Sequence, residues 1–158
     1  MSYQFSRTPK KVQIINTEHR SITTDIPCPG TKEVLETLDK YESRSMHGQI
    51  PVIWKAANDF NIYDIKDNKF IDFTSAIFFS NVGHSNSKVT IAMQEMLKKP
   101  ILGCYAYANE MRATYLKKLI EFCGSRVDKA FLLSAGTEAT EAAFKLMRVS
   151  GQSKKKNR

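Results

Sequence analysis

The 158-residue sequence lacks several features that would assign it at once to a large class of proteins. It has no run near the roughly 18 apolar residues that a membrane-spanning helix needs, so we expect a soluble globular protein without membrane contact. Its three cysteines show no C-x-x-C spacing, which disfavours a disulfide framework and a zinc knuckle, and we predict no metal site. Residues 1–8 lack the apolar segment of a secretory signal, and we therefore expect a cytoplasmic protein.

Basic residues gather at the two ends of the chain. Lys and Arg number 24 against 16 Asp and Glu, which gives a net charge of +8. Residues 1–11 supply three of these charges and residues 151–158 supply four, with no acidic residue in either segment. The body between them is nearly neutral and has no pattern of basic and aromatic residues typical of nucleic-acid binding, so we expect no nucleic-acid partner.

Apolar periodicity divides the chain into four parts. Residues 1–30 carry three of the five prolines and no clear period, which predicts an N-terminal arm that lies over other elements rather than forming the core. Residues 31–84 combine a helix with an antiparallel hairpin. Residues 85–151 contain three helical stretches, and residues 152–158 form a basic tail because Gly151 and its two neighbours interrupt the helical pattern.

Turn and cap residues locate the individual elements. The dipeptide Asp67-Asn68 predicts a tight hairpin turn because both residues tolerate positive φ. Strands are expected at 51–55, 60–64 and 69–73. One helix is expected after the run Ser85-Asn86-Ser87, which offers helix caps, and another from Asn109 to Cys123. Their apolar faces are expected to contribute core residues such as Met93, Met96 and Met111.

Residues 129–149 form the most specific pattern. A short apolar strand at 129–133 leads into the turn Ser134-Ala135-Gly136-Thr137, and a helix follows from Glu138 to Val149. The first amides of such a helix have no partner within it and the helix dipole adds positive charge, so the turn can hold a phosphate. Gly136 would allow close backbone approach and Thr137 would add a hydroxyl donor, although Thr137 would also serve simply as an N-cap. The turn matches neither a P-loop nor G-x-G-x-x-G, which disfavours nucleotide binding.

Three segments of the chain carry a resemblance to a known family. They are the hairpin region 62–84, the segment 105–112 and the turn with its helix at 134–148. In order and spacing they resemble the N-terminal part of the class III aminotransferases, the fold-type-I pyridoxal-phosphate family that includes 4-aminobutyrate, acetylornithine, ornithine and taurine-type transaminases. The resemblance extends from about Thr17 to Gly151.

This resemblance implies an α/β fold: a small N-terminal α+β domain, and then, over residues 85–151, the start of the large domain that binds pyridoxal phosphate. Of that large domain, the first strand, turn and helix are expected here. The resemblance implies pyridoxal 5'-phosphate as cofactor, with Gly136 and Thr137 as contacts to its phosphate. It places Ile50 and Ile77 near the substrate entrance. It also implies a homodimer that transfers an amino group from an amine or ω-amino acid to a 2-oxo acid.

Other parts of the family's catalytic machinery are missing from the sequence. In the family, the Schiff-base lysine, the carboxylate at the pyridine nitrogen and the stacking aromatic ring all follow the phosphate turn. Only 20 residues follow Glu138, and no lysine matches the Schiff-base position. We therefore expect a truncated aminotransferase with no catalytic residue and no activity by itself. The alternative is a non-catalytic protein that binds a phosphate ligand, or an acidic partner through its basic ends.

Two residues depart from the family pattern, and one histidine is conspicuous. Asn68 and Ala76 stand where glycine is common in the family; Asn also tolerates the left-handed region. His84, after Gly83, is expected to be a hydrogen-bonded loop histidine rather than an acid or base.

Overall fold

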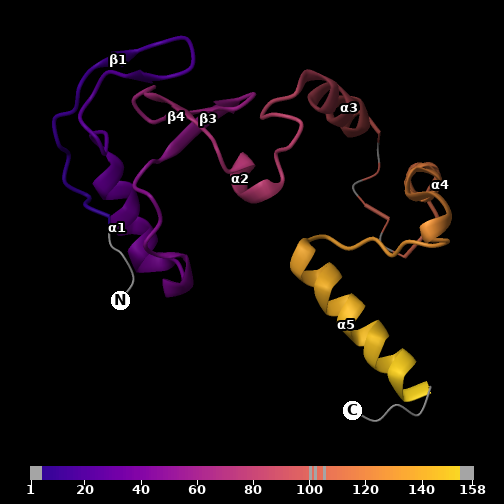
Figure 1. Ribbon diagram of the computed structural model, residues 1–158. Coiled ribbons are helices and arrows are strands. Elements are labelled where there is room, and N and C mark those ends of the chain that lie inside the picture. Colours follow the sequence, from indigo (N-terminus) through magenta and orange to yellow (C-terminus); the bar gives the residue numbers. More distant parts are fainter. Residues whose placement is uncertain (1–4, 100, 102, 105, 154–158) are drawn as a thin grey trace. The chain divides into compact units, whose positions relative to one another are not determined.

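The computed structural model describes residues 5–99, 101, 103–104 and 106–153 (Figure 1). The chain divides into two compact units, Met1–Pro100 and Ile101–Arg158, and each is described by itself. Within the predicted basic tail, residues 154–158 lie outside the described residues, as does Tyr105 of the segment that resembles the family. Among the described residues, no helix is long and apolar enough to span a bilayer.

A five-stranded antiparallel sheet organises the first unit. Its strands are β1 (Ile15–Asn16), β2 (Ser21–Ile22), β3 (Trp54–Asn58), β4 (Asn61–Asp64) and β5 (Lys69–Ile71). They lie in the order β1-β2-β5-β4-β3, so β2 from the start of the chain pairs with β5. The predicted hairpin is confirmed, because Asn61 pairs with Ile71 and Ile62 with Phe70 across β4 and β5.

The first strand of this hairpin region, β3, begins later than the predicted strand at 51–55. Asp59 has a φ of 51°, which allows a tight turn that sets Asn58 opposite Asn61. From that pair the register continues through Ala57–Ile62 and Ala56–Tyr63, and it shifts between Ala56 and Trp54. Pro51 has no N–H to donate to the ladder, so the strand does not extend back to it.

Local capping signals set where the helices of the first unit begin. These elements are α1 (Thr31–Tyr41), the 3-10 turn η1 (Arg44–Met46), α2 (Ser75–Phe78) and α3 (Ser87–Leu97). α1 follows Gly30, whose φ of 96° glycine adopts without strain. α3 follows Asn86, whose side chain accepts hydrogen bonds from the backbone N–H groups of Lys88 and Val89. The predicted cap at Asn86 is therefore confirmed.

The N-terminal arm supplies part of the sheet and of the core, so the expectation that residues 1–30 form no core element is wrong. β1 and β2 both belong to the arm (Figure 1). Ile22 and Cys28 are each 2% exposed and, with Ile62 of β4, belong to the small buried apolar core of this unit. A segment without clear periodicity can still form strands here, because pairing with β5 satisfies its backbone groups.

Asn68 is fully buried and ties the arm to the hairpin. Its Oδ1 accepts hydrogen bonds from the backbone N–H groups of Thr23 and Thr24 at 2.8 and 3.3 Å. Its Nδ2 donates to Thr24 Oγ1 and Asp64 Oδ2, both at 2.7 Å. The positive φ of this turn, 62°, belongs to Asp67 and not to Asn68. The asparagine therefore makes hydrogen bonds that a glycine in its place could not make.

The second unit contains α4 (Glu110–Cys123), the 3-10 turn η2 (Gly124–Arg126) and α5 (Gly136–Ser153). α4 begins after Asn109, as predicted, because the Asn109 side chain accepts from the backbone N–H of Arg112 at 3.1 Å. The helix ends at Gly124, whose φ of 64° suits a glycine terminator.

Two predictions for the second unit are wrong in detail. Residues 129–133 do not form the expected strand, because no described residue pairs with them and a single strand has no partner for its backbone groups. α5 continues through Gly151 to Ser153 instead of breaking before them. A glycine within a helix costs about 1 kcal/mol, and α5 accommodates Gly151 in its last turn.

The apolar helix faces that were expected to be buried are largely exposed. Met93 of α3 is 62% exposed, Met111 of α4 is 46% exposed and Met147 of α5 is 65% exposed. The periodicity of the sequence correctly identified these apolar stripes as parts of helices. It did not reveal whether any described residue covers them.

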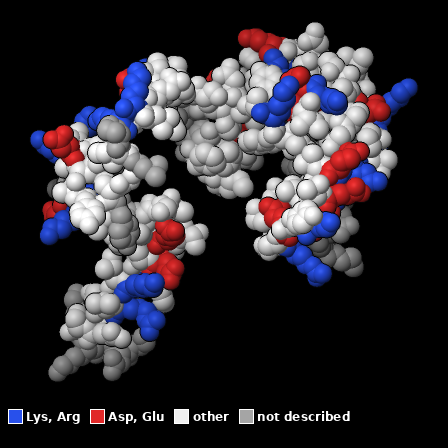
Figure 2. Space-filling view, turned by 180° about the vertical axis from the view of Figure 1, so that it is seen from behind, with Lys and Arg blue, Asp and Glu red and all other residues white. Residues whose placement is uncertain are grey.

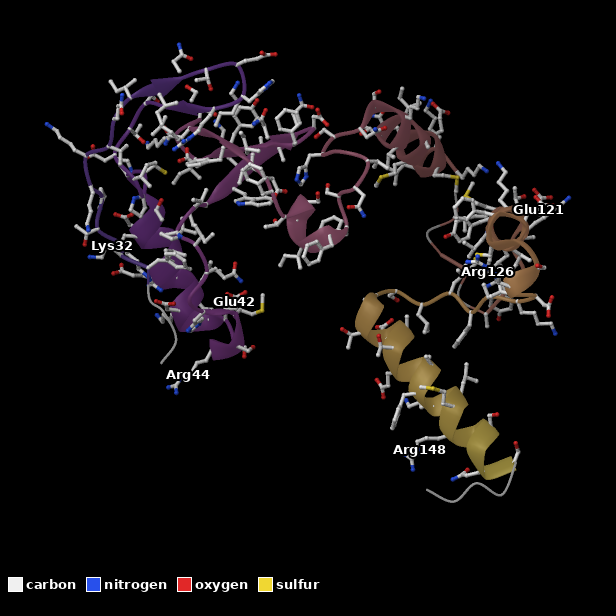
Figure 3. The ribbon with its side chains drawn as sticks, viewed as in Figure 1. Lys32, Glu42, Arg44, Glu121, Arg126 and Arg148 are labelled. Carbon is white, nitrogen blue, oxygen red and sulfur yellow. The ribbon has the colours of Figure 1, made fainter. Side chains whose placement is uncertain are left out.

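Charged residues of both signs are mixed over both units (Figure 2). Several pair along a helix at i and i+4, at distances of 3.7 Å for Lys32–Glu36 and 3.0 Å for Lys145–Glu141. Arg148 of α5 instead lies over the ring of Phe144, 5.9 Å from its centroid (Figure 3). These exposed pairs contribute little stability each.

Candidate functional site

The predicted phosphate turn lies at the start of α5. Gly136 and Thr137 are the first two residues of the helix, so Thr137 is not its N-cap. The N–H of Ala139 donates to Ala135 O at 3.0 Å, whereas the described residues provide no acceptor for the amides of residues 136–138. Three consecutive backbone donors are therefore free to bind an anion at the positive end of the helix dipole.

The surroundings of this turn leave room for a ligand. A Cβ built on Gly136 would meet no atom within 4 Å. Glu138 Oε2 accepts from the backbone N–H of Ser134 at 3.0 Å, and Thr140 Oγ1 donates to Gly136 O at 3.0 Å. The first of these bonds orders the turn, the second lies within the helix α5, and neither uses the hydroxyl of Thr137. The donor set is thus one hydroxyl and a short run of amides, which suits a phosphate group.

The two predicted substrate-pocket residues lie in the first unit, whereas Gly136 and Thr137 lie in the second. Ile50 precedes β3 and is 65% exposed, and Ile77 lies in α2 and is 79% exposed. The surroundings of each are therefore described within its own unit.

A cavity of about 550 Å³ lies next to the segment that contains Ile50. It is lined by Phe5, Arg7, Leu35, Asp39, His47, Gly48, Gln49 and Pro51. Arg7 donates to both carboxylate oxygens of Asp39, and this hydrogen bond lowers the pKa of Asp39. His47 Nδ1 lies 3.8 Å from Asp39 Oδ1, while His47 Nε2 is buried without a hydrogen-bond partner among the described residues. Sequence reasoning missed this cavity because no local pattern relates Arg7 to Asp39.

The short helix α2, which carries Ile77, is a left-handed turn. The φ angles are 47°, 50°, 62° and 70° for Ser75, Ala76, Ile77 and Phe78. Within the turn, the N–H of Phe78 donates to Thr74 O at 2.8 Å. Each L-residue in this conformation costs roughly 1–2 kcal/mol, so the turn as a whole costs roughly 4–8 kcal/mol. Interactions with other residues must offset this cost.

Asp72 supplies such interactions from the end of β5. Its Oδ1 accepts from the N–H and the Oγ1 of Thr74, at 2.8 and 2.7 Å. Its Oδ2 accepts from the N–H of Ala76 at 2.9 Å and lies 3.0 Å from His84 Nε2. The Asp72 side chain is only 3% exposed, and burial by itself would raise its pKa. The hydrogen bonds from His84, Thr74 and Ala76 outweigh burial and hold the pKa of Asp72 far below its usual range.

His84 is fixed on three sides, so the prediction of a hydrogen-bonded loop histidine is confirmed. Besides the contact with Asp72, its Nδ1 lies 3.2 Å from Ser80 Oγ, and its backbone forms a bridge with Asp59. The ring also packs edge-on against Trp54, with centroids 5.8 Å apart. Gly83, with a φ of 86°, allows this approach, because a Cβ there would lie 2.7 Å from Asp59 Oδ1.

Sequence reasoning did not identify Asp72 as part of the site. An Asp two residues before a Thr is a common turn pattern, and this local pattern could have indicated that Asp72 stabilises a turn. The contribution of His84 to the same carboxylate comes from 12 residues further along the chain and has no local signature.

The family of the chain follows from comparison with known proteins. A family model described as aminotransferase class III matches residues 42–158. The chain belongs to the class III aminotransferases, and the resemblance found in the sequence is confirmed.

Individual relatives agree with this family. The chain is 32% identical over 111 residues to the acetylornithine aminotransferase of Methanocaldococcus jannaschii, a match that covers 70% of this chain and 27% of the relative. It is 29% identical over 129 residues to the mitochondrial ornithine aminotransferase of Arabidopsis thaliana, covering 82% and 26%. The chain therefore spans about a quarter of the length of these relatives.

Solved structures confirm the fold class. The ornithine δ-aminotransferase of Plasmodium falciparum superposes with a TM-score of 0.71 at 28% identity, covering 81% of this chain and 33% of that one. The acetylornithine aminotransferase of Elizabethkingia anophelis gives a TM-score of 0.69 at 28% identity, with the same coverage. A taurine:2-oxoglutarate aminotransferase from Bifidobacterium kashiwanohense, solved in complex with PLP and glutamate, shares the fold at 24% identity and a TM-score of 0.66, covering 75% and 27%.

Proposed function

We propose that this chain forms the N-terminal portion of a pyridoxal-phosphate-dependent aminotransferase and holds the phosphate of the cofactor at the start of α5. The observation that carries the proposal is the set of unpaired amides at residues 136–138, next to the free hydroxyl of Thr137, in a chain of this family. Both Gly136 and Thr137 contribute to that set. The open space beside Gly136 supports a close backbone approach to a phosphate.

The residues at the start of α5 fit the phosphate end of the cofactor. Backbone N–H groups and one hydroxyl would donate to the phosphate oxygens, and the α5 dipole would favour their charge. When bound, pyridoxal phosphate supplies an aldehyde and an electron-withdrawing ring, which are the reactive groups of amino-group transfer. We propose that the chain by itself binds the phosphate without turnover, because no lysine of the sequence matches the family's reactive lysine.

The reaction and assembly that we propose are those of the family. A complete protein would transfer an amino group from an amine or ω-amino acid to a 2-oxo acid, with Ile50 and Ile77 near the substrate entrance. A homodimer is supported by the exposed apolar faces of α3, α4 and α5, since exposed stripes of this kind mark surfaces that other polypeptide covers. Location in the cytoplasm stays a prediction.

Direct binding measurements test the phosphate turn. Purified chain is titrated with pyridoxal phosphate and, separately, with inorganic phosphate, and the two are then competed. We expect Thr137→Val to weaken binding about tenfold, because one hydrogen bond to a charged group is lost. Thr140→Val is the matched control: it lies in the same helix, and its hydroxyl is already bonded to the helix carbonyl Gly136 O, so it is not a free donor for a ligand. Equal binding by the two variants would contradict the assignment of Thr137.

Borohydride reduction separates the proposed function from its alternatives. After incubation with pyridoxal phosphate and reduction, modified lysines are mapped by mass spectrometry. We expect scattered labelling at low occupancy and no transamination. A single lysine labelled in stoichiometric amount, together with turnover, would overturn the proposal that the chain is inactive by itself. Binding of phosphate esters with no preference for pyridoxal phosphate would favour a general phosphate-binding protein.

A further inference from the structure

We propose that Asp72 is a positioning residue that fixes the left-handed turn of α2 and thereby sets where the side chain of Ile77 projects. The part of this inference that concerns the substrate entrance rests on the proposed function. The part that concerns the turn rests on the hydrogen bonds of Asp72 with Thr74, Ala76 and His84.

The turn needs a positioning residue because its own four residues disfavour the positive φ angles that it adopts. Ser75, Ala76, Ile77 and Phe78 all carry a Cβ and all have positive φ. None of them is glycine, asparagine or aspartate, the residues that adopt this region readily. A run of four such residues would return to negative φ unless contacts from outside held it.

The two carboxylate oxygens of Asp72 bind different parts of the turn. Oδ1 binds the N–H and the hydroxyl of Thr74, which fixes the entrance to the turn. Oδ2 binds the N–H of Ala76 inside the turn and is itself held by His84 Nε2. Because the carboxylate is buried and charged, these hydrogen bonds are stronger than neutral ones. His84 is itself fixed by its backbone bridge to Asp59, which lies between β3 and β4. The hydrogen bonds of Asp72 and His84 therefore attach the turn to the sheet.

The turn presents apolar side chains to solvent rather than packing them. Ile77, Phe78 and Phe79 are 79%, 78% and 79% exposed. The turn therefore gains little from burial of its large apolar side chains within the described residues. Its conformation depends on the carboxylate of Asp72, and the direction of Ile77 depends on that conformation.

Substitution of Asp72 tests this dependence without any cofactor. Asp72→Asn keeps the size of the side chain but replaces one acceptor oxygen with an NH₂ group, which faces either the Thr74 donors or Ala76 N–H and His84. In the labelled 158-residue chain, we expect loss of the strong intraresidue amide-to-Hα NOE that positive φ gives at Ala76 and Ile77. We also expect chymotrypsin to cleave after Phe78 or Phe79 at least about tenfold faster. The amide signals of β4 and β5 should keep their dispersion.

The matched control is Asp67→Asn. Asp67 is an exposed aspartate of the same unit, with a positive φ of its own and an ion pair to Lys55 at 2.8 Å. The variant removes the same charge, and we expect it to leave the NOEs and cleavage rates at α2 unchanged. If Asp72→Asn folds and also leaves them unchanged, the positioning role is overturned.

Two further variants keep the test decisive if Asp72→Asn folds poorly. Ala76→Pro removes the donor to Oδ2 and forces negative φ while Asp72, Thr74 and His84 remain, so it should abolish the turn signals and spare the sheet. Ala76→Gly removes the steric opposition, so adding Asp72→Asn to it should raise the cleavage rate less than it does in the parent chain. Equal effects of Asp72→Asn in the two backgrounds, or turn signals that survive Ala76→Pro, would refute the inference. Because no cofactor is present, these results stand independently of pyridoxal-phosphate binding.

Discussion

Replacing Asn68 with alanine should destabilise the first unit more than any exposed substitution in the same sheet. Asn68 is fully buried, and its side chain joins the arm to the hairpin through Thr23, Thr24 and Asp64. Alanine removes all five side-chain hydrogen bonds and leaves space in their place. The N–H groups of Thr23 and Thr24 lose their acceptor, and Asp64 Oδ2 loses a donor.

The magnitude follows from which of these groups can reach water. Thr23 is exposed, so its N–H can be hydrated after the change at little cost. Thr24 is half-buried and Asp64 is 1% exposed, and leaving such groups unsatisfied costs about 1–3 kcal/mol each. We therefore expect a loss of about 3 kcal/mol in the free energy of unfolding. Asn68→Asp should cost still more at neutral pH, because it sets a second carboxylate against Asp64.

Urea unfolding followed by fluorescence measures this loss, because Trp54 is the single tryptophan and lies in β3. Asn58→Ala is the control: Asn58 is an exposed residue of the same sheet, and its side chain makes no hydrogen bond with the described residues. The control should change the free energy of unfolding by less than about 0.5 kcal/mol. A loss below about 1 kcal/mol for Asn68→Ala would show that Asn68 does not tie the arm to the hairpin.

Three further predictions concern other residues. Ala76→Gly should raise the free energy of unfolding by about 0.5–1 kcal/mol, measured in urea, because glycine adopts positive φ without strain. The pKa of Asp72 is lower in the folded chain than in the unfolded one. The stability difference between the parent and Asp72→Asn should therefore be full above the ordinary aspartate range and should shrink as the pH falls below about 4. Burial raises the pKa of the Cys28 thiol, so iodoacetamide should label it at least about tenfold more slowly than Cys104 and Cys123; equal native rates would contradict the buried position.

Sequence reasoning predicted those elements whose signals lie within a few residues. The caps at Asn86 and Asn109 and the hairpin at Asp67-Asn68 each depend on a side chain or a turn that acts locally, and the structure confirms all three. The family could also be predicted, because its motifs appear in order along the chain.

Features that depend on distant residues were predicted poorly. The arm joins the sheet through a pairing between Ser21 and Lys69. Local periodicity does not predict a pairing between residues so far apart in the sequence. The strand expected at 129–133 is absent because a strand requires a neighbour as well as a suitable sequence. For the site, the turn at Gly136 and Thr137 was assigned from the resemblance to the family, with the spacing of small residues as a weaker signal, and its role as a phosphate contact stays a prediction.

The pairing of β2 with β5 also bears on how the first unit folds. β3, β4 and β5 follow one another closely and can pair through short turns, and β1 and β2 form a second local hairpin. Joining the two requires closure of a loop between Ser21 and Lys69, which is the slow, entropically costly step in such a topology. Until the arm docks, β5 is an open strand edge of the kind that recruits other chains. The N-terminal arm therefore acts as an edge cover, and the interval before it docks is when this unit is most prone to aggregate.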